Sequence, residues 1–361
     1  MTPRERVLAA LNRREPDKVP RTLGFTPPMF EKFRQHTGSD SPADYFDFEV
    51  RHAGLQPTRL QTDFTSYLGE LPPNAWVNEW GIGHVPGSMY HFEDYVHPLR
   101  NATSPQDIRN YPFPDVNADY RYAGLAEKVA AWHERGYAVA QGTPHYSGTL
   151  FECAWILVGM EKLLSDFLLN PELAAALLDW LTESAVTSAE RLARAGVDVL
   201  TTGDDVGTQR GMMMSPALWR QWFKPRMAEI IAAAKRVKRD ILVFYHSDGN
   251  IEPIIPELIE IGVDILNPVQ PECMDPAQLK REYKDDLSFW GTIGTQTTMP
   301  FGTPEQVKET IHERIETVGR GGGLLLAPTH VLEPEVPWEN VVAFMEAIDE
   351  HRADGGQTAD G

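Results

Sequence analysis

Short runs of branched and aromatic residues alternate with longer amphipathic segments along most of the chain. The amphipathic segments have helical spacing, as in Leu173, Leu177 and Leu181. The apolar runs between them are nearly continuous, which is typical of strands in a parallel sheet buried on both faces. A run at 64–68 is weaker than the others. The clear runs span residues 19–25, 137–141, 197–202, 241–245, 263–266, 287–290 and 324–327.

Capping motifs mark where several of the predicted helices begin. Residues 2–5 have the threonine, proline and glutamate of a capping box, and Thr303 begins a similar motif. Proline also follows Asp275, Asn170 and Ser215, whose side chains can accept hydrogen bonds from the first turn of a helix. The pattern therefore predicts helix starts at these five places.

Strand–helix units repeated about eight times predict the α/β class and a single (β/α)8 TIM barrel. The rival, a doubly wound open sheet, would favour a glycine-rich turn after the first strand, and residues 23–28 do not form one. Residues 70–135 fit the repeat poorly and hold many prolines and aromatics. We interpret them as an elaborated insertion over the C-terminal face of the barrel. The domain then spans residues 1–352, followed by a disordered tail at 353–361.

Charge and cysteine content exclude several classes of protein. Lysine and arginine number 33 and aspartate and glutamate 52, so the net charge is −19. An acidic chain repels phosphate backbones, and we expect no nucleic-acid partner. No apolar stretch reaches the roughly 20 residues of a membrane span. The chain also opens on an amphipathic helix without a signal core, so we expect a cytoplasmic protein without a membrane partner. Two cysteines, Cys153 and Cys273, exclude a disulfide scaffold and a four-cysteine zinc site.

Candidate metal ligands follow two of the predicted strands. Active sites in this fold lie at the carboxyl ends of the strands. The run 241–245 is followed by His246, Ser247 and Asp248, and the last run is followed by His330. Two histidines and a carboxylate form a set that zinc and non-haem iron both use. We predict that His246, Asp248 and His330 bind a divalent metal. The alternative is that the histidines bind the substrate or act as general acid and base without a metal.

Further strand ends supply candidates for catalysis and substrate binding. Asp204 and Asp205 follow the run 197–202, and we predict that one is a general base or holds the substrate. Alternatively, Asp204 caps the loop and only Asp205 faces the pocket. Tyr146 is a third catalytic candidate. The predicted substrate-binding side chains are those of His145, Asn267, Gln270, Gln296, Trp290 and Trp80.

Three other features have structural interpretations. Cys153 lies in a predicted helix at 148–159 and is expected to pack in the core. Cys273 follows the sixth strand and is interpreted as a packed or half-exposed thiol in preference to a metal ligand. The glycines at 321–323 precede the last strand, and we interpret them as a helix stop and tight turn, not as a phosphate loop.

Several segments of the chain have a recognisable sequence pattern. Those at residues 4–11, 16–20, 204–209 and 215–216 resemble segments of the uroporphyrinogen decarboxylase superfamily. The resemblance covers nearly the whole chain and is specific in the C-terminal half. It implies a single (β/α)8 barrel, and members of the superfamily often pair as homodimers. The specific segments are 245–251, 262–270, 301–305 and 327–340.

One branch of that superfamily contains decarboxylases that act without a cofactor on a porphyrinogen bearing many carboxylates. They use an arginine-rich loop after the first strand, an aspartate, a tyrosine and a histidine on the last strand. Residues 21–28 here lack the arginine pair of that loop, so several substrate carboxylates would be left unpaired in a closed pocket. His330 falls where that branch has its histidine, but the missing arginines disfavour porphyrinogen decarboxylation.

The other branch contains zinc-dependent methyltransferases that work with corrinoid proteins. Their metal motif is histidine-x-cysteine-glycine-asparagine plus a late cysteine. Residues 246–250 match this frame with Asp248 in the first cysteine position, and His330 lies at or near the late one. The resemblance therefore implies a metal, with zinc expected, at the predicted ligands. A carboxylate and an imidazole in place of two thiolates make a harder site, which suits polarising an oxygen better than activating a thiol.

The leading hypothesis is a metal-dependent methyltransferase or demethylase that acts on a small methylated substrate, with a corrinoid protein as methyl acceptor. The first alternative is a cofactor-free decarboxylase, which predicts that Arg21, and with it Arg34 or Arg210, points into the pocket. The second alternative is a non-catalytic ligand-binding protein.

Overall fold

A seven-stranded parallel sheet forms the centre of the protein. The computed structural model describes residues 1–89 and 92–354. The strand order is β1-β5-β6-β9-β10-β11-β12, and every neighbouring pair is parallel. Its strands are β1 (Val50–Arg51), β5 (Ala138–Gly142), β6 (Val199–Gly203), β9 (Leu242–His246), β10 (Ile265–Asn267), β11 (Ser288–Ile293) and β12 (Leu324–Pro328).

The predicted first strand, residues 19–25, closes this sheet into a barrel. Arg21 forms a parallel bridge to Leu326 of β12, and Phe25 forms one to Leu332, beyond the end of that strand. On the other side, the Arg21 backbone N–H donates to the carboxylate of Glu49, just before β1, at 3.1 Å. The segment thus lies between β12 and β1 as the eighth parallel segment of the barrel wall. The predicted (β/α)8 barrel is confirmed.

One expectation about the strands was wrong. Residues 64–68 are not a strand: α4 (Thr65–Leu68) occupies them, and the buried side chains of Phe64 and Leu68 are four residues apart, as on one helix face. The strand beside β5 is β1 instead. It is two residues long, too short to produce a visible alternation of apolar and polar positions.

The helices begin where the capping motifs predict. Thr2 and Thr303 form complete capping boxes, and Asp275 and Ser215 accept hydrogen bonds from the first turns. Asn170 precedes a helix, although its side chain accepts no capping hydrogen bond. The helices are α1 (Pro3–Leu11), α2 (Pro27–Thr37), α3 (Pro42–Tyr45), α4, α5 (Pro105–Arg109), α6 (Leu125–Glu134), α7 (Phe151–Val158), α8 (Met160–Leu169), α9 (Pro171–Ala195), α10 (Pro216–Trp222), α11 (Lys224–Val237), α12 (Ile255–Glu260), α13 (Pro276–Tyr283), α14 (Thr298–Phe301), α15 (Pro304–Arg314) and α16 (Trp338–Asp354), with 3-10 turns at Asp119–Tyr122 and Glu252–Ile254 and a π-helix at Ile315–Gly319.

Two apolar layers hold the barrel together. Alternate strand residues such as Val199 and Leu325 form an interior cluster, which Val7 and Leu11 of α1 join. Their neighbours along the strands, such as Leu200, face the surrounding helices, where Cys153 of α7 is fully buried. The interior is therefore a packed core rather than a pore, and α1 seals its amino-terminal end.

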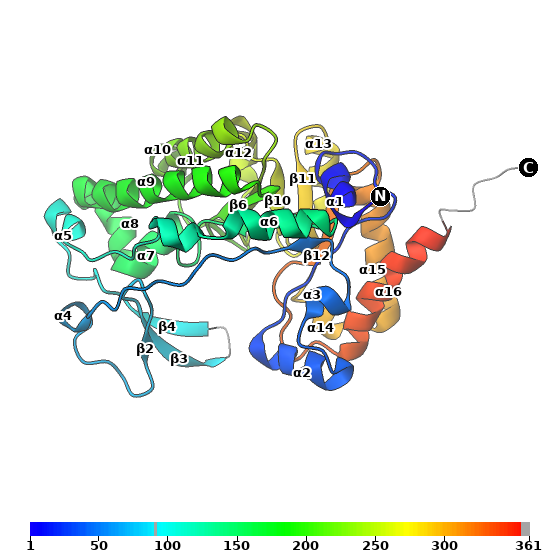
Figure 1. Cartoon of the computed structure of the whole chain (residues 1–361), viewed down its shortest axis with the longest axis horizontal. Coiled ribbons are helices and arrows are strands. Elements are labelled where there is room, and N and C mark those ends of the chain that lie inside the picture. The colour runs from blue at the N-terminus through cyan, green and yellow to red at the C-terminus, as the bar shows by residue number, and fades with distance from the viewer. Residues whose placement is uncertain (90–91, 355–361) are drawn as a thin grey trace, which may run out of the picture.

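Residues 70–135 contain a separate antiparallel sheet, drawn in cyan in Figure 1, with the order β2-β3-β4. Ring contacts join it to the loop after β5: Trp80 packs on His145, and His84 packs on Tyr146. The placement of the whole segment as an insertion over the C-terminal face stays a prediction. Its strands are β2 (Trp76–Val77), β3 (Gly83–Met89) and β4 (Phe92–Val96).

The glycines before β12 form a turn, as predicted. All three have positive φ values, and a Cβ at Gly322 would lie 2.5 Å from the backbone of Arg14. Their N–H groups donate to Glu15, to Gly319 and to Ala10, so no backbone donor of this turn is left for a phosphate.

α16 continues to Asp354, and the rest of the predicted tail, 355–361, lies outside the described residues. Within 1–89 and 92–354, no helix combines the length and the apolar composition that crossing a lipid bilayer requires.

Candidate active site

A cavity of about 390 Å³ lies at the carboxyl ends of β5, β6 and β9. Three of the predicted site residues, Asp205, His246 and His330, line it. Among the described residues of the lining, none is lysine or arginine. The other lining residues are Gly142, Thr143, Ser147, Gly148, Thr149, Glu152, Thr201, Thr202, Gly203 and Phe244.

A compact set of possible metal ligands borders this cavity. Asp205, His246 and Asp248 each offer one ligand atom, and these atoms all lie within 4.8 Å of one another. Asp205 Oδ1 is 3.4 Å from His246 Nε2 and accepts a hydrogen bond from the Asp248 N–H at 2.7 Å. The structure thus brings together two of the predicted ligands and adds Asp205, while His330 lines the cavity outside this set.

The carboxylate of Asp248 fits a bound cation. Its Oδ1 atom is buried and has no hydrogen-bond partner within the described part of the chain, and a buried carboxylate oxygen without a partner is costly. Burial and the charge of Asp205 raise the pKa of Asp248, although the charges of His246 and His330 partly oppose this. A divalent ion among the three side chains would satisfy the oxygen and offset the repulsion.

The hydrogen bonds of Asn267 fix the ring of His246. Asn267 Nδ2 donates to the carbonyl of Trp290 at 2.6 Å, so Asn267 Oδ1 is the atom that meets His246 Nδ1 at 2.5 Å. Since an amide oxygen only accepts, Nδ1 carries the proton, and in the neutral ring Nε2 presents a lone pair toward Asp205. Metal-binding histidines characteristically have such a partner on the other ring nitrogen.

The carboxylates around His246 also change its titration. Burial alone favours the neutral imidazole, but the charges of Asp205 and Asp248 and the hydrogen bond to Asn267 outweigh it and raise the pKa of His246. A bound metal would compete with this proton, because only the neutral ring is a ligand.

Glu152, on α7, is a lining residue that sequence reasoning missed. Its carboxylate accepts hydrogen bonds from Ser147 Oγ at 2.7 Å and from the Asp205 N–H at 3.0 Å. Burial and the charge of Asp205 raise the pKa of Glu152. One signal was present: Glu152 is the only charged residue between Gly148 and Gly159, in a helix otherwise read as core.

Asp204 and Asp205 have different environments although they are adjacent. Asp204 is 2% exposed, and its carboxylate accepts hydrogen bonds from the N–H groups of Leu150 and Glu152 at the start of α7. Burial raises its pKa well above the ordinary range. Asp205 instead lines the cavity. This arrangement matches the alternative in which Asp204 caps a loop, and the catalytic role of Asp204 stays a prediction.

Four predicted substrate-binding residues bond to other protein groups and do not line the cavity. Asn267 holds His246, as described above. Gln270 Oε1 accepts from the Gly249 N–H at 2.7 Å, and Gln296 Oε1 accepts from the side chain of Gln209 at 2.8 Å. The Trp290 indole donates to Thr22 Oγ1 at 3.1 Å. Contact of these four with a substrate stays a prediction.

The other three predicted residues form an aromatic cluster beside the loop after β5. His145 Nδ1 lies 3.0 Å from Thr143 Oγ1, and its ring centroid is 5.5 Å from that of Trp80. Burial lowers the pKa of His145 to about 4, so its ring is neutral at pH 7. Tyr146 packs on Tyr95, and burial raises its pKa. The roles predicted for these residues are untested.

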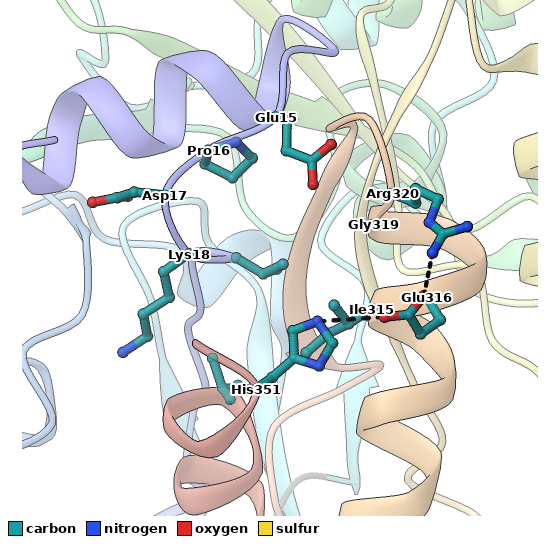
Figure 2. A pocket seen from close by; sticks show the side chains of 11 residues that line it. Glu15, Pro16, Asp17, Lys18, Ile315, Glu316, Gly319, Arg320 and His351 are labelled. Atoms are coloured by element: carbon teal, nitrogen blue, oxygen red, sulfur yellow. Dashed lines mark ion pairs between the residues drawn. The ribbon is translucent and has the colours of Figure 1, made fainter. Parts of the chain in front are cut away.

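A cavity of about 480 Å³ lies at the opposite end of the barrel, between residues 15–19 and the π-helix. Figure 2 shows Glu316 between Arg320 and His351, at 3.1 and 3.6 Å. Lys18 pairs with Asp349 on α16. The charges here are partnered by the protein itself, so the larger volume does not indicate a binding site.

The arginines required by the decarboxylase hypothesis do not line the cavity at the carboxyl end. Arg21 pairs with Asp349 at 2.8 Å, and Arg34 pairs with Asp40 at 2.7 Å. Arg210 is also absent from the described lining.

The comparison with protein families identifies the class of this barrel. The model of the uroporphyrinogen decarboxylase (URO-D) family matches residues 104–351. The chain therefore belongs to this family, as the sequence motifs predicted.

Known proteins of two kinds are similar to the chain. Over 197 residues, 55% of each protein, it is 26% identical to the methylcobamide:CoM methyltransferase MtaA of Methanosarcina barkeri, so the match spans about half the length of that relative. Over 362 residues, it is 26% identical to the uroporphyrinogen decarboxylase of Coxiella burnetii, covering 95% of this chain and 94% of the relative. A methyltransferase from Methanosarcina mazei has the same fold, with a TM-score of 0.68 at 20% identity over 97% of this chain and 99% of that one.

Proposed function

We propose that the protein is a metal-dependent methyltransferase or demethylase that acts on a small methylated substrate, with a corrinoid protein as methyl acceptor. The observation that carries the proposal is the set of Asp205, His246 and Asp248 beside the cavity, with a buried oxygen of Asp248 that lacks a partner among the described residues. The similarity to a methylcobamide:CoM methyltransferase supports it. The proposal includes zinc as the ion, a homodimer and a cytoplasmic location.

The side chains of this site have separate tasks in the proposed reaction. Asp205, His246 and Asp248 would hold the metal, which when bound supplies Lewis-acid polarisation of the heteroatom that leaves the methyl group. Asn267 keeps Nε2 of His246 directed toward the site. Glu152 accepts the backbone N–H of Asp205 and so fixes the loop that carries this ligand.

Proton transfer to the leaving group falls to His330 in this proposal. As the methyl carbon bonds to the acceptor, its bond to oxygen breaks and the electron pair stays on the oxygen, which then takes up a proton. His330 lines the cavity outside the compact ligand set, and an imidazole can act as a general acid. The sequence predicted His330 as a metal ligand and left an acid–base role as the alternative. The proposal assigns His330 the acid–base role.

Metal analysis tests this proposal directly. Protein purified without added metal is expected to contain one divalent ion per chain by elemental mass spectrometry, and His246→Ala is expected to lose it together with activity. His133→Ala is the matched control, because His133 pairs with Asp198 at the other end of the barrel, at 2.8 Å. A metal-free wild type, or full metal retention in His246→Ala, would exclude the mechanism.

The second candidate is decarboxylation, which the nearly full-length similarity to a uroporphyrinogen decarboxylase favours. The described lining of the cavity offers no lysine or arginine to hold substrate carboxylates. We therefore expect no coproporphyrinogen after incubation with uroporphyrinogen, and its appearance would reverse the ranking of the two candidates.

A further inference from the structure

The charges around the cavity indicate the class of substrate, an inference that rests on the proposed function. The described lining contains Glu152 and Asp205 but no lysine or arginine. If Asp205 and Asp248 hold a divalent ion, their two charges neutralise it. The carboxyl group of Glu152 is then the acidic group of the described lining that the ion does not occupy.

Each of the two histidines of the lining already has a carboxylate of the protein as a counter-charge, so neither ring is reserved for an anionic substrate. His246 Nε2 lies 3.4 Å from Asp205 Oδ1, and the Nδ1–H group of the same ring donates to Asn267 Oδ1. His330 interacts electrostatically with Asp248. The His246 ring is thus already directed to a carboxylate of the protein, and His330 lies near enough to Asp248 to interact with its charge.

The carboxylate of Glu152 is fixed in place and has capacity for a ligand. Ser147 Oγ and the Asp205 N–H each donate one hydrogen bond to it, on different oxygens. A carboxylate has about four acceptor positions, so further donors can be bound. Thr143, Thr201, Thr202 and Phe244 form other parts of the wall.

We propose that the substrate is a small methylated compound bearing an ammonium group, and that Glu152 is the residue that selects it. The ammonium group donates to Glu152, while the methylated heteroatom lies toward Asp205, His246 and Asp248. A substrate carboxylate in the same position meets the acidic group of Glu152 without a cation and is rejected, because like charges at short distance repel each other.

Three small methyl ethers that differ in charge test whether the cavity prefers a cationic substrate. They are 2-methoxyethylammonium, 2-methoxyethanol and methoxyacetate, titrated against the full chain by ligand-observed NMR, with and without a chelator. The cation is expected to bind about tenfold more tightly than the alcohol, as one charge-assisted hydrogen bond allows, and methoxyacetate is expected to bind more weakly than both. Equal affinities, or tighter binding of methoxyacetate, overturn the proposal.

Substitution of Glu152 tests the assignment of the residue. Glu152→Gln keeps the shape and an acceptor for the Asp205 N–H, so the cation is expected to lose about tenfold in affinity while the alcohol is unchanged. Glu309→Gln, at an exposed site outside the cavity, is the matched control. An unchanged preference for the cation in folded Glu152→Gln rejects the assignment, and the wild-type ranking tests the substrate class even if this variant does not fold.

The test separates the two proposals. If the wild type binds no metal but prefers the cation, the proposed methyltransferase function fails and the charge preference stands. If metal binds stoichiometrically and the cation is not preferred, only the substrate class fails.

Discussion

The two ends of the barrel both carry buried carboxylates, but they differ in what neutralises them. At the amino-terminal end, Asp198 accepts hydrogen bonds from Arg4, from His133 and from the Val139 N–H. At the carboxyl end, Asp205 and Asp248 have no lysine or arginine partner in the described part of the chain, and one oxygen of Asp248 is unpartnered.

The pKa values of Asp17 and Asp248 differ in the same way, although burial raises the pKa of Glu49 at the amino-terminal end despite its pairing with Arg6. Arg6 holds the pKa of Asp17 down at about 2 at the amino-terminal end, whereas burial raises the pKa of Asp248 at the carboxyl end. Carboxylates that fold the barrel are paired by the protein, and those that are left unpaired indicate a ligand. Cavity volume does not make this distinction, since the larger cavity lies at the end where charges are paired.

The largest effect is expected at the paired end. Asp198→Asn removes the charge that Arg4 and His133 share, and buried pairs are costly to break. We expect the free energy of unfolding to fall by about 3 kcal/mol in urea denaturation, with metal content unchanged. A loss of metal without a loss of stability would contradict the division between the two ends.

Asp248→Asn is expected to weaken metal binding without destabilising the fold. The amide is a weaker ligand than the carboxylate, so metal affinity is expected to fall about a hundredfold in chelator competition, about 2.7 kcal/mol. The metal-free variant is expected to be at least as stable as the metal-free wild type, because a buried carboxylate has been neutralised. Marked destabilisation of the metal-free variant would show that Asp248 serves the fold.

A smaller loss of metal affinity is expected when Asn267, which holds the ring of His246, is replaced. Asn267→Ala removes the acceptor for the Nδ1 proton, and loss of such partners weakens metal binding by about tenfold. Asn267→Asp keeps an acceptor and is expected to recover part of the affinity. Gln296→Ala, which removes an exposed amide bonded to Gln209, serves as the control for metal binding.

The smallest effect is a dependence of stability on pH. The pKa of Asp17 is lowered from 3.8 to about 2, chiefly by its hydrogen bond to Arg6. A lowered folded-state pKa stabilises the protein above the unfolded-state pKa, and this contribution is lost as the pH falls from about 4 toward 2. After allowance for solvent screening, we expect wild type to exceed Asp17→Asn by about 1 kcal/mol at pH 6. The gap should shrink below pH 4 in urea titrations.

Much of this barrel and part of its site could be predicted from local sequence. Proline after a capping residue starts a helix through contacts within one turn, so the starts at Thr2, Thr303 and Asp275 needed no tertiary information. Continuous apolar runs identified six of the strands because burial on both faces requires them. The pair His246 and Asp248 was recognisable because both follow one strand.

Tertiary structure alone decided which carboxylates meet at the site. Asp204 and Asp205 are equivalent in sequence, but the end of β6 turns one toward the start of α7 and the other into the cavity. Glu152 joins them from a helix more than 50 residues away in sequence, with its carboxylate on the backbone of Asp205. Spacing along the chain determines local structure and the face of a strand on which a side chain lies. Which side chains from different strands come into contact depends on barrel closure and strand register, and no local sequence pattern encodes these.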